Sequence, residues 1–492
     1  MKNMLTEGLN QFERKQEECL HITLLANSLW KDRKVLCLYH GYSLIDEKVE
    51  YLLNFHSQIG AQPASSKLHS IVEILKDLIC LPELPAVIDL GLLKDSFDDS
   101  KPITKQALIA KLWSINLQHR SVAKDVVLYG FGRIGRILAR ELCSDPALKV
   151  QLALRAVVTR DPVSLTALKK RASLLAKDSI HGSFKGIIDI DEQSNSLIIN
   201  GIQVQFISAQ NPADVNYLDY GINNALLIDN TGKFRDKKTL THHLSTGSIA
   251  KVIVTAPAKD IPNVVFGVNH KDRLDLAEQL FSTASCTTNA IAPVLQILDN
   301  QYDVVKAHIE SIHAYTNDQN LVDNIHPKAR RGRAAALNMV ITDTGAGSAV
   351  AKVIPKLKDK ITANAIRVPI PNGSLAILVV ELNKKTSIPH VHQLFLPFAS
   401  KPAKHKQVDL CFDEDLVSSD ILGNPAAGII DACATSLSVD GRTLSLYIWY
   451  DNEYGYAMQV LGFAGFLACE HMQDNPTNEL PSEVVGLMGF CN

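Results

Sequence analysis

The sequence predicts a chain of three parts: a mostly helical N-terminal extension, an α/β domain built on a parallel sheet, and an α+β domain with a mainly antiparallel or mixed sheet. Within residues 1–120, apolar side chains recur at three- and four-residue spacing, which favours helix. From residue 124, short apolar runs alternate with glycine turns and amphipathic stripes, as in a parallel sheet with crossover helices. Longer apolar runs after residue 286 indicate the second sheet.

Each of the two later domains has its own expected elements. In the α/β domain, a strand over 125–129 precedes a glycine turn and a helix, and further strands are expected over 150–159, 224–232 and 250–258. In the α+β domain, strands are expected over 304–316, 364–371, 374–382 and 443–451. A length of 492 residues agrees with several domains, because single cores stop growing near ~250–300 residues.

The composition excludes several classes of protein. The 50 Lys and Arg against 52 Asp and Glu leave a net charge of -2, which gives no basis for nucleic-acid or anionic-membrane binding. No run of ~18 apolar residues could span a bilayer, and the N-terminus has no apolar signal region, so we expect a cytoplasmic protein. The nine cysteines are scattered, without a CxxC pair or metal-ligand spacing, and are expected to be reduced thiols.

A glycine-rich turn follows the first strand of the α/β domain. Gly130, Gly132 and Gly135 form G-x-G-x-x-G at the start of an expected helix. In this setting the first glycine permits the turn, the second lets the backbone approach a pyrophosphate, and the third allows close helix packing. The helix N-terminus then offers N–H groups to the phosphates. We predict dinucleotide binding here, with a purely structural turn as the alternative.

The end of the next strand bears on the choice of coenzyme. An acidic residue there binds the ribose hydroxyls of NAD, whereas an arginine accommodates the extra phosphate of NADP. The sequence offers Asp161 for the first role, with Arg155 and Arg160 close by for the second. The alternative is that all three are surface charges.

Cys286, in "TASCTTNAIAP", is the candidate nucleophile. A catalytic cysteine needs its pKa lowered, which a histidine does by forming a thiolate–imidazolium pair. Among sixteen histidines, His313 in "SIHAYTNDQ" is the chosen partner, because it lies at an expected strand end among hydroxyl and amide groups. Without further context, a lone cysteine and a lone histidine are more often structural than catalytic.

The residues from Lys124 to about Cys469 resemble phosphorylating glyceraldehyde-3-phosphate dehydrogenase, in particular a long bacterial form with an N-terminal extension. Ten motifs occur in the family's order. They are "GFGRIGR" (130–136), "DSIHG" (178–182), "NTGKF" (230–234), "TAPAKD" (255–260), "SCTTN" (285–289), "HAYTNDQ" (313–319), "RRGRAAALNMV" (330–340), "DTGAGSAVAKVIP" (343–355), "AIRVPIPN" (365–372) and "WYDNEYGY" (449–456).

The resemblance implies an oxidation of D-glyceraldehyde 3-phosphate to 1,3-bisphosphoglycerate with NAD or NADP, NAD being slightly favoured. Cys286 corresponds to the family's thiol, which forms a hemithioacetal and then a thioester, and His313 to the histidine that activates it. Arginines suit the two phosphate sites because their fork makes paired hydrogen bonds. The implied substrate and phosphate contacts are Ser285, Thr287, Thr316, Arg331, Thr344, Gly345 and Arg367.

The resemblance also implies cofactor contacts and an assembly. The cofactor positions are Gly130, Phe131, Gly132, Arg133, Ile134, Gly135, Asp161, Thr231, Gly232, Thr255, Asn317, Asn452 and Tyr456, with core packing as the rival role for Tyr456. Residues 121–285 and 452–492 would form the Rossmann-like dinucleotide-binding domain, and 286–451 the catalytic domain. Residues 316–345 resemble a loop that contacts a neighbouring subunit, so a homotetramer is expected.

Three departures from the family leave alternatives open. Ala290 stands where many relatives have a second cysteine, the second strand ends in "VTRD", and the extension of 1–120 has no assigned role. Erythrose-4-phosphate dehydrogenase is the nearest rival activity. A cysteine hydrolase would leave the glycine turn and the arginines unused. A regulatory or binding protein on a dinucleotide-binding fold is the alternative from a different class.

Overall fold

The computed structural model describes residues 2–59, 65–98, 103–114, 123–271, 277–399 and 406–473. The chain divides into two compact units, which are described separately. The first comprises Met1–Ala123, Pro146–Gln151 and Cys469–Asn492, and the second comprises Lys124–Asp145 and Leu152–Ala468. Among the described helices, none combines the length and apolar character required to cross a bilayer.

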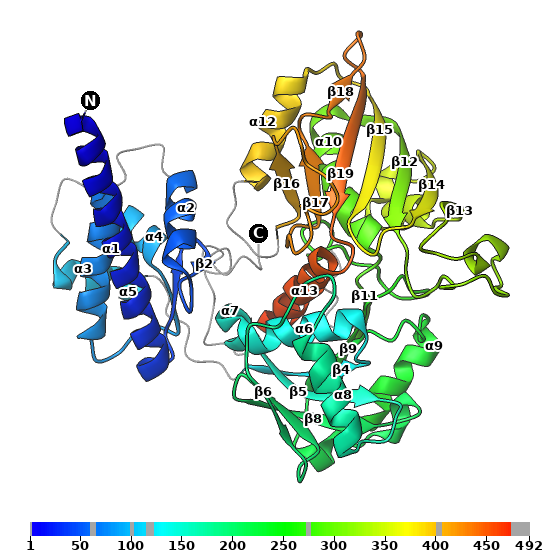
Figure 1. Ribbon diagram of the computed structural model, residues 1–492, viewed down its shortest axis with the longest axis horizontal. Helices are drawn as coiled ribbons and strands as arrows, with labels where there is room; N and C mark the ends of the chain where they lie inside the picture. The colour runs from blue at the N-terminus through cyan, green and yellow to red at the C-terminus, as the bar shows by residue number, and fades with distance from the viewer. Residues whose placement is uncertain are drawn as a thin grey trace. The chain divides into compact units, whose positions relative to one another are not determined.

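The N-terminal part of the first unit is mostly helical, as predicted, and also contains a small sheet (Figure 1, blue). Its helices are α1 (Lys2–Arg33), α2 (Val49–Ile59), α3 (Ser65–Ile79), α4 (Leu90–Asp95) and α5 (Lys105–Ser114). Strands β1 (Leu36–Tyr39), β2 (Tyr42–Ser43) and β3 (Val87–Asp89) lie in the order β2-β1-β3, and β1 pairs with β3 in parallel. Helices α1 and α3 pack against each other, and Ile22, Leu29 and Leu75 belong to a core shared with β1.

The second unit begins with the predicted dinucleotide-type sheet. Its strands are β4 (Lys124–Tyr129), β5 (Leu152–Thr159), β6 (Ile188–Asp191), β7 (Ser196–Ile199), β8 (Ile202–Ser208), β9 (Ala225–Asp229), β10 (Ile249–Val254) and β11 (Leu280–Ser282). The order is β11-β10-β9-β4-β5-β8-β7-β6, with parallel pairing from β11 to β8 and an antiparallel hairpin at the far edge. The sheet therefore carries the expected parallel core, and the β6–β7 hairpin is an addition to it.

The chain reverses its direction of travel across this sheet at β4. From β4 it moves to β5 on one side through α6 (Arg133–Ser144), and later returns to β9 on the other side. Such a switch point leaves a crevice at the carboxyl ends of the central strands, where open α/β sheets bind their ligands. The glycine turn at 130–135 follows β4 at this place.

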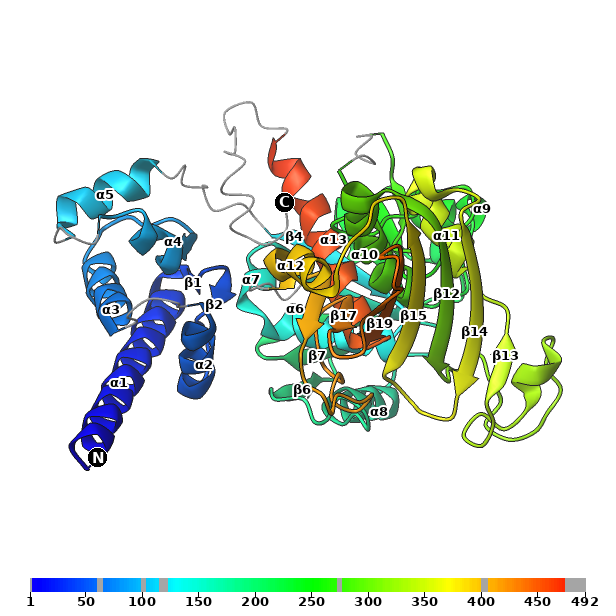
Figure 2. The same ribbon diagram turned by 90° about the horizontal axis from the view of Figure 1, so that it is seen from above.

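The other sheet of this unit is mixed, as predicted. Its strands are β12 (Val304–Ala314), β13 (Val340–Thr342), β14 (Ile361–Val368), β15 (Ser374–Leu382), β16 (Val408–Cys411), β17 (Gly428–Asp431), β18 (Ser436–Leu437) and β19 (Thr443–Tyr450). Seven of them follow the order β13-β14-β12-β15-β19-β17-β16, and β18 pairs with β19 beside this path; the pairs β12–β14 and β16–β17 are parallel and the others antiparallel. Helices α10 (Cys286–Tyr302), α11 (Ala346–Val353) and α12 (Ile388–Ala399) pack around it (Figure 2).

The chain returns to the first sheet of this unit through α13 (Tyr454–Gln473), drawn in red in Figure 1. Phe463 of α13 meets Phe281 of β11 with ring centroids 5.5 Å apart, and Tyr454 donates to Glu141 of α6 at 3.3 Å. The contacts of α13 agree with a place for residues 452–468 beside this sheet, whereas Cys469–Asn492 belong to the first unit; the assignment of 452–492 to the dinucleotide-binding domain stays a prediction. Residues 474–492 of that assignment lie outside the described residues.

Gly428 in β17 provides a test of the packing beneath α10. A Cβ at this position would lie 2.7 Å from the carbonyl oxygen of Ala290 and 2.9 Å from Ile448 Cγ2. Because backbone cannot move aside cheaply, Gly428→Ala is expected to lower the free energy of unfolding by about 1–3 kcal/mol in urea denaturation. Gly347→Ala is the control: its added Cβ meets neighbours only at 3.4 Å, and alanine favours helix α11 by about 0.5–1 kcal/mol. Equal stability of the two variants would contradict the close approach.

Candidate active site

Cys286 is the first residue of α10, and the local sequence determines how it is presented. Ser285 caps the helix, with its Oγ accepting from Thr288 N at 3.1 Å, and Ala284 before it has a positive φ of 54°. Asn289 donates its side-chain amide to the carbonyl oxygens of Thr283 at 2.8 Å and Ser285 at 3.0 Å. The "SCTTN" motif thus fixes a sharp turn that holds the thiol at a helix N-terminus, where a thiolate is stabilised.

The structure brings Cys286 and His313 together. Cys286 Sγ lies 3.4 Å from His313 Nε2 at the end of β12. His313 Nδ1 lies 2.7 Å from the carbonyl oxygen of Ala314, a distance at which two acceptors would repel each other. Arg367 Nη1 is 3.0 Å from the same Nδ1 and also donates to this carbonyl oxygen at 2.9 Å, so we assign the ring proton to Nδ1, with both groups donating to Ala314 O, which leaves Nε2 to accept the proton of the thiol.

Burial acts on both members of this pair. It raises the pKa of the Cys286 thiol, against the lowering effects of the Arg367 charge and the Thr287 hydrogen bond. Burial, reinforced by the charge of Arg367, lowers the pKa of His313 to about 3. These directions favour a neutral thiol–imidazole pair without substrate, because desolvation opposes both charged forms. These directions predict a neutral resting pair, and the thiolate–imidazolium pair expected from the sequence is the alternative that an experiment must separate from it.

Two arginines surround the pair with positive charge. In the β12–β14 register, Arg367 stands opposite His313, and its Nη1 donates to Ala314 O at 2.9 Å and Thr316 Oγ1 at 3.5 Å. Its buried Nε has no hydrogen-bond partner among the described residues. Arg331 donates from Nε to Thr342 Oγ1 at 2.9 Å, pairs with Asp318, and also lowers the pKa of His313. Such a site is suited to an anion next to the thiol.

The other predicted phosphate contacts lie on turns with defined local roles. Thr287 Oγ1 is bonded to the hydroxyl of Tyr450 at 3.0 Å. Thr344 Oγ1 accepts from Ala346 N at 3.1 Å, and Gly345 begins α11 without a side-chain cap, so N–H groups at that helix start are left for an anion. No described contact joins Thr344 or Gly345 to Cys286, and their phosphate role stays a prediction.

The glycine turn has the geometry that a dinucleotide needs. Gly130 has a φ of 103°, which favours glycine, and a Cβ at Gly135 would lie 2.5 Å from Asn230 Oδ1. At Gly132 a Cβ would meet nothing within 4 Å, and the glycine begins α6 without a side-chain cap. Open space at an uncapped helix start fits a pyrophosphate, so these residues fit the cofactor. Phe131 and Ile134 lie within the same turn and first helical residues.

Further cofactor positions follow the carboxyl ends of neighbouring strands. Thr231 and Gly232 follow β9, and Thr231 Oγ1 donates to Asp229 at 2.7 Å. Thr255 follows β10 and is bonded through Oγ1 to the carbonyl oxygen of Asp229 at 3.3 Å. Asp161 follows β5 and pairs with Arg171 at 3.1 Å. Because these strands are adjacent in the sheet, their ends form one edge beside the glycine turn.

The remaining three predicted cofactor residues differ in their surroundings. Asn452 Oδ1 accepts from Ser374 Oγ at 2.7 Å, and Ser374 in turn accepts from Ala314 N, next to His313. Tyr456 is buried with its hydroxyl bonded to Thr283 and Ala284, which favours the packing role beneath the Cys286 turn. Asn317 lies on the loop after β12.

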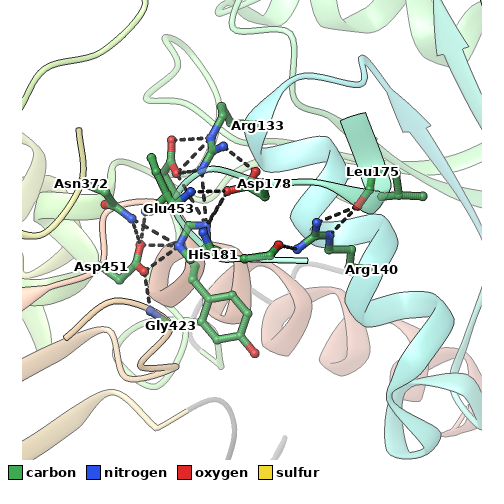
Figure 3. Close-up of polar contacts among 12 residues, drawn as sticks. Arg133, Arg140, Leu175, Asp178, His181, Asn372, Gly423, Asp451 and Glu453 are labelled. Atoms are coloured by element: carbon green, nitrogen blue, oxygen red, sulfur yellow. Dashed lines mark hydrogen bonds and ion pairs between the residues drawn. The ribbon is translucent and has the colours of Figure 1, made fainter. Parts of the chain in front are cut away.

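A network centred on Asp451 connects the two sheets of this unit (Figure 3). The Asp451 carboxylate is buried and accepts from His181 Nε2, Asn372 Nδ2 and Gly423 N, each at 2.8 Å. It also accepts from the backbone N–H groups of the next residues, 453 and 454, at the start of α13. These hydrogen bonds, His181 foremost, hold the pKa of Asp451 below its usual range despite burial.

Arg133 belongs to this network rather than pointing at a free ligand site. Its guanidinium donates to Asp178 and Glu453 at 2.5 Å each and lies 3.3 Å from His181 Nδ1 (Figure 3). These contacts hold the Arg133 side chain, so only the Arg133 backbone is left to contact the cofactor. The sequence predicts a cofactor contact for Arg133. It gives no role to the other members of the network, Asp178, His181, Asp451 and Glu453, although the motifs "DSIHG" and "WYDNEYGY" contain them.

Comparison with protein families gives two matches that together cover most of the second unit. Residues 124–237 match the model described as glyceraldehyde 3-phosphate dehydrogenase, NAD binding domain. Residues 285–452 match the model described as glyceraldehyde 3-phosphate dehydrogenase, C-terminal domain. The two matched regions contain the glycine turn and the Cys286–His313 pair respectively.

Individual relatives carry the same name. A glyceraldehyde-3-phosphate dehydrogenase-like protein of Pseudomonas aeruginosa is 43% identical over 446 residues, which are 89% of this chain and 96% of the relative. Glyceraldehyde-3-phosphate dehydrogenase 1 of Bacillus cereus is 38% identical over 69% of this chain and 96% of its own length. The enzyme of Geobacillus stearothermophilus is 36% identical over 70% of this chain and 99% of its own length. The chain belongs to the glyceraldehyde-3-phosphate dehydrogenase family and is an NAD-dependent enzyme of that family.

Proposed function

We propose that the chain catalyses the phosphorylating oxidation of D-glyceraldehyde 3-phosphate to 1,3-bisphosphoglycerate. The observation that carries this proposal is the 3.4 Å contact between Cys286 Sγ and His313 Nε2, with Arg367 directly beside the histidine. A nucleophile, a base and a cation for a phosphate thus lie together. The cofactor edge lies in the same unit, connected to His313 through Ser374 and Asn452.

The first step is the addition of the thiol to the aldehyde. His313 Nε2 takes the proton of Cys286, and the sulfur forms a bond to the aldehyde carbon. The imidazolium then gives the proton to the developing oxyanion, which yields a hemithioacetal. The low pKa of His313 favours this return of the proton, because the charged imidazole is costly in a buried site.

The second step oxidises the hemithioacetal. His313 takes the hydroxyl proton while the C–H bond breaks with its electron pair, which leaves a thioester on Cys286. When bound, the nicotinamide of NAD or NADP supplies the hydride acceptor. An oxygen of inorganic phosphate then adds to the thioester carbon, and the C–S bond breaks to release the acyl phosphate and the Cys286 thiolate. Arg367 and Arg331 hold the two phosphate groups in this proposal.

A homotetramer is part of the proposal. The segment between β12 and β13 carries exposed apolar side chains: Leu321, Val322, Ile325, Leu337 and Met339, between 68% and 96% exposed. Apolar residues so fully exposed on one segment mark an interface, and a second copy of the chain is the proposed occupant. We also place the protein in the cytoplasm, where its reduced thiols agree with the free cysteines among the described residues.

One assay separates the candidate activities. Nicotinamide reduction is measured at 340 nm with glyceraldehyde 3-phosphate or erythrose 4-phosphate, each with and without inorganic phosphate. We expect turnover of the triose phosphate only when inorganic phosphate is present. Faster turnover of the tetrose would support the sister activity, and no turnover of either with intact cofactor binding would favour a binding protein on this fold.

The nucleophile is tested by Cys286→Ser. Because serine lacks an ionisable thiol of comparable reactivity, turnover is expected to fall by about a thousandfold or more, with cofactor binding unchanged. Cys433→Ser is the control, since Cys433 is an exposed thiol on the segment after β17. Equal activity of the two variants would remove Cys286 from its role.

The protonation state of the resting pair is tested by alkylation. Because the pKa of Cys286 is raised, the protonated thiol dominates near neutral pH. Its alkylation by iodoacetamide, followed on the Cys286 peptide by mass spectrometry, should therefore rise with pH between about pH 6 and 8, because loss of the thiol proton to solvent adds thiolate to the share formed by transfer to His313. Arg367→Gln should slow the reaction at each pH, because the guanidinium lowers the thiol pKa. A rate independent of pH would show that the reacting thiolate keeps its proton on His313, as a thiolate–imidazolium pair.

A further inference from the structure

The turn that follows β5 is held in place by the end of β8. Thr159 O accepts from Ala209 N at 2.9 Å, and the carbonyl oxygen of Arg160 accepts from Gln210 Nε2 at 3.0 Å and Ser208 Oγ at 3.4 Å. The backbone from Thr159 to Asp161 therefore has a fixed path where it leaves the sheet. The Oγ1 of Thr159 is buried here and has no partner among the described residues.

Arg171 of α8 (Leu165–Ala176) lies against this turn. Its Nη2 is 3.1 Å from Asp161 Oδ2, and the two side chains differ greatly in exposure, 17% for Arg171 and 81% for Asp161. The guanidinium lies over the ring of Phe206 at 5.9 Å from its centroid. Arg171 is thus held by an aromatic face, whereas Asp161 extends into solvent.

The same aromatic ring connects Arg171 to the glycine turn. Phe206 of β8 contacts Phe131, the second residue of that turn, in an edge-to-face arrangement with centroids 5.3 Å apart. Arg171, Phe206 and Phe131 therefore form a continuous series from α8 to the proposed pyrophosphate site. In dinucleotide-binding sheets, the adenosine ribose lies between the glycine turn and the end of the second strand, which here is β5.

Arg155 and Arg160, the arginines that the sequence offers for the extra phosphate of NADP, do not have the position that Arg171 has. Arg155 lies inside β5, four residues before its end, and its Nε is 3.9 Å from Asp125 on the neighbouring strand β4. Arg160 is exposed, and its described hydrogen bonds use only its carbonyl oxygen. The arginine at this place, Arg171, comes instead from the next helix, α8. The residue spacing after the glycine turn does not indicate it.

We propose that Arg171 binds the 2′-phosphate of NADP and that Asp161 is the exchangeable counter-ion of its guanidinium. An ion pair with so exposed a carboxylate is weak, so a phosphate dianion that accepts two guanidinium hydrogen bonds replaces it at little cost. With NAD, Asp161 is free to accept from the ribose hydroxyls instead. The chain therefore binds both coenzymes, and Arg171 determines the affinity for NADP. This inference rests on the proposed dinucleotide site.

Calorimetric titration of the full-length protein with NAD, NADP and 2′,5′-ADP tests the proposal without any turnover. We expect wild-type protein to bind NADP at least as tightly as NAD. Arg171→Gln should weaken NADP and 2′,5′-ADP binding by tenfold or more while NAD changes by less than twofold. Asp161→Asn should strengthen NADP binding severalfold, because it removes the competing carboxylate. Arg155→Gln, a charge loss on the preceding strand, should leave the NADP-to-NAD ratio unchanged.

The outcomes distinguish a failure of this inference from a failure of the proposed dehydrogenase function. Wild-type protein that binds NAD but not NADP overturns the role of Arg171 and leaves the dehydrogenase intact. An Arg171→Gln variant that weakens both coenzymes equally, or neither, also overturns it, and an Arg171→Lys variant with partly retained NADP affinity supports it. If wild-type protein binds neither coenzyme, the proposed function fails together with the inference.

Discussion

The buried carboxylate of Asp451 is the interaction on which the catalytic unit depends. A carboxylate without solvent is tolerated only when hydrogen bonds replace its hydration, and here five donors from four segments supply them. The segments are the loop before β6, the β14–β15 turn, the loop before β17 and the start of α13. Because each segment loses its partner if the carboxylate moves, the dinucleotide sheet and the mixed sheet are held in one relation to each other.

Three consecutive residues, Asp451 to Glu453, connect the proposed cofactor-binding edge to the Cys286–His313 pair. Asp451 binds His181, Asn452 binds Ser374, and Glu453 binds Arg133 at the start of α6. Ser374 is bonded to the backbone next to His313. Helix α6, whose N-terminus is the proposed pyrophosphate site, and His313, the proposed base, are therefore both supported by one short piece of backbone. In the family mechanism, hydride transfer is sensitive to misplacement of these parts by ~1 Å, which a rigid support prevents.

Local patterns predicted most of the fold and the chemical centre, because alternating apolar runs and glycine turns are encoded by neighbouring residues. The strands carrying His313 and Arg367 and the glycine turn occur where they were expected. Long-range partners could not be predicted in the same way. Arg133 binds Glu453 across 320 positions, and the Asp161 partner is Arg171 from the next helix rather than a residue of the strand. The protonation of the thiol depends on burial, which no motif records.

His313 and Arg367 stand opposite each other in the β12–β14 register, and this limits how the range of substrates can change. The proposed proton acceptor and one of the proposed anion-binding cations are neighbours on adjacent strands of a single sheet, so their separation is fixed by strand spacing. The other cation, Arg331, lies on the loop between β12 and β13. A longer or shorter phosphorylated aldehyde therefore cannot be fitted by altering the sheet without displacing the base. Variants selected for new chain lengths should accumulate their substitutions in that loop, and β12 and β14 should stay unchanged.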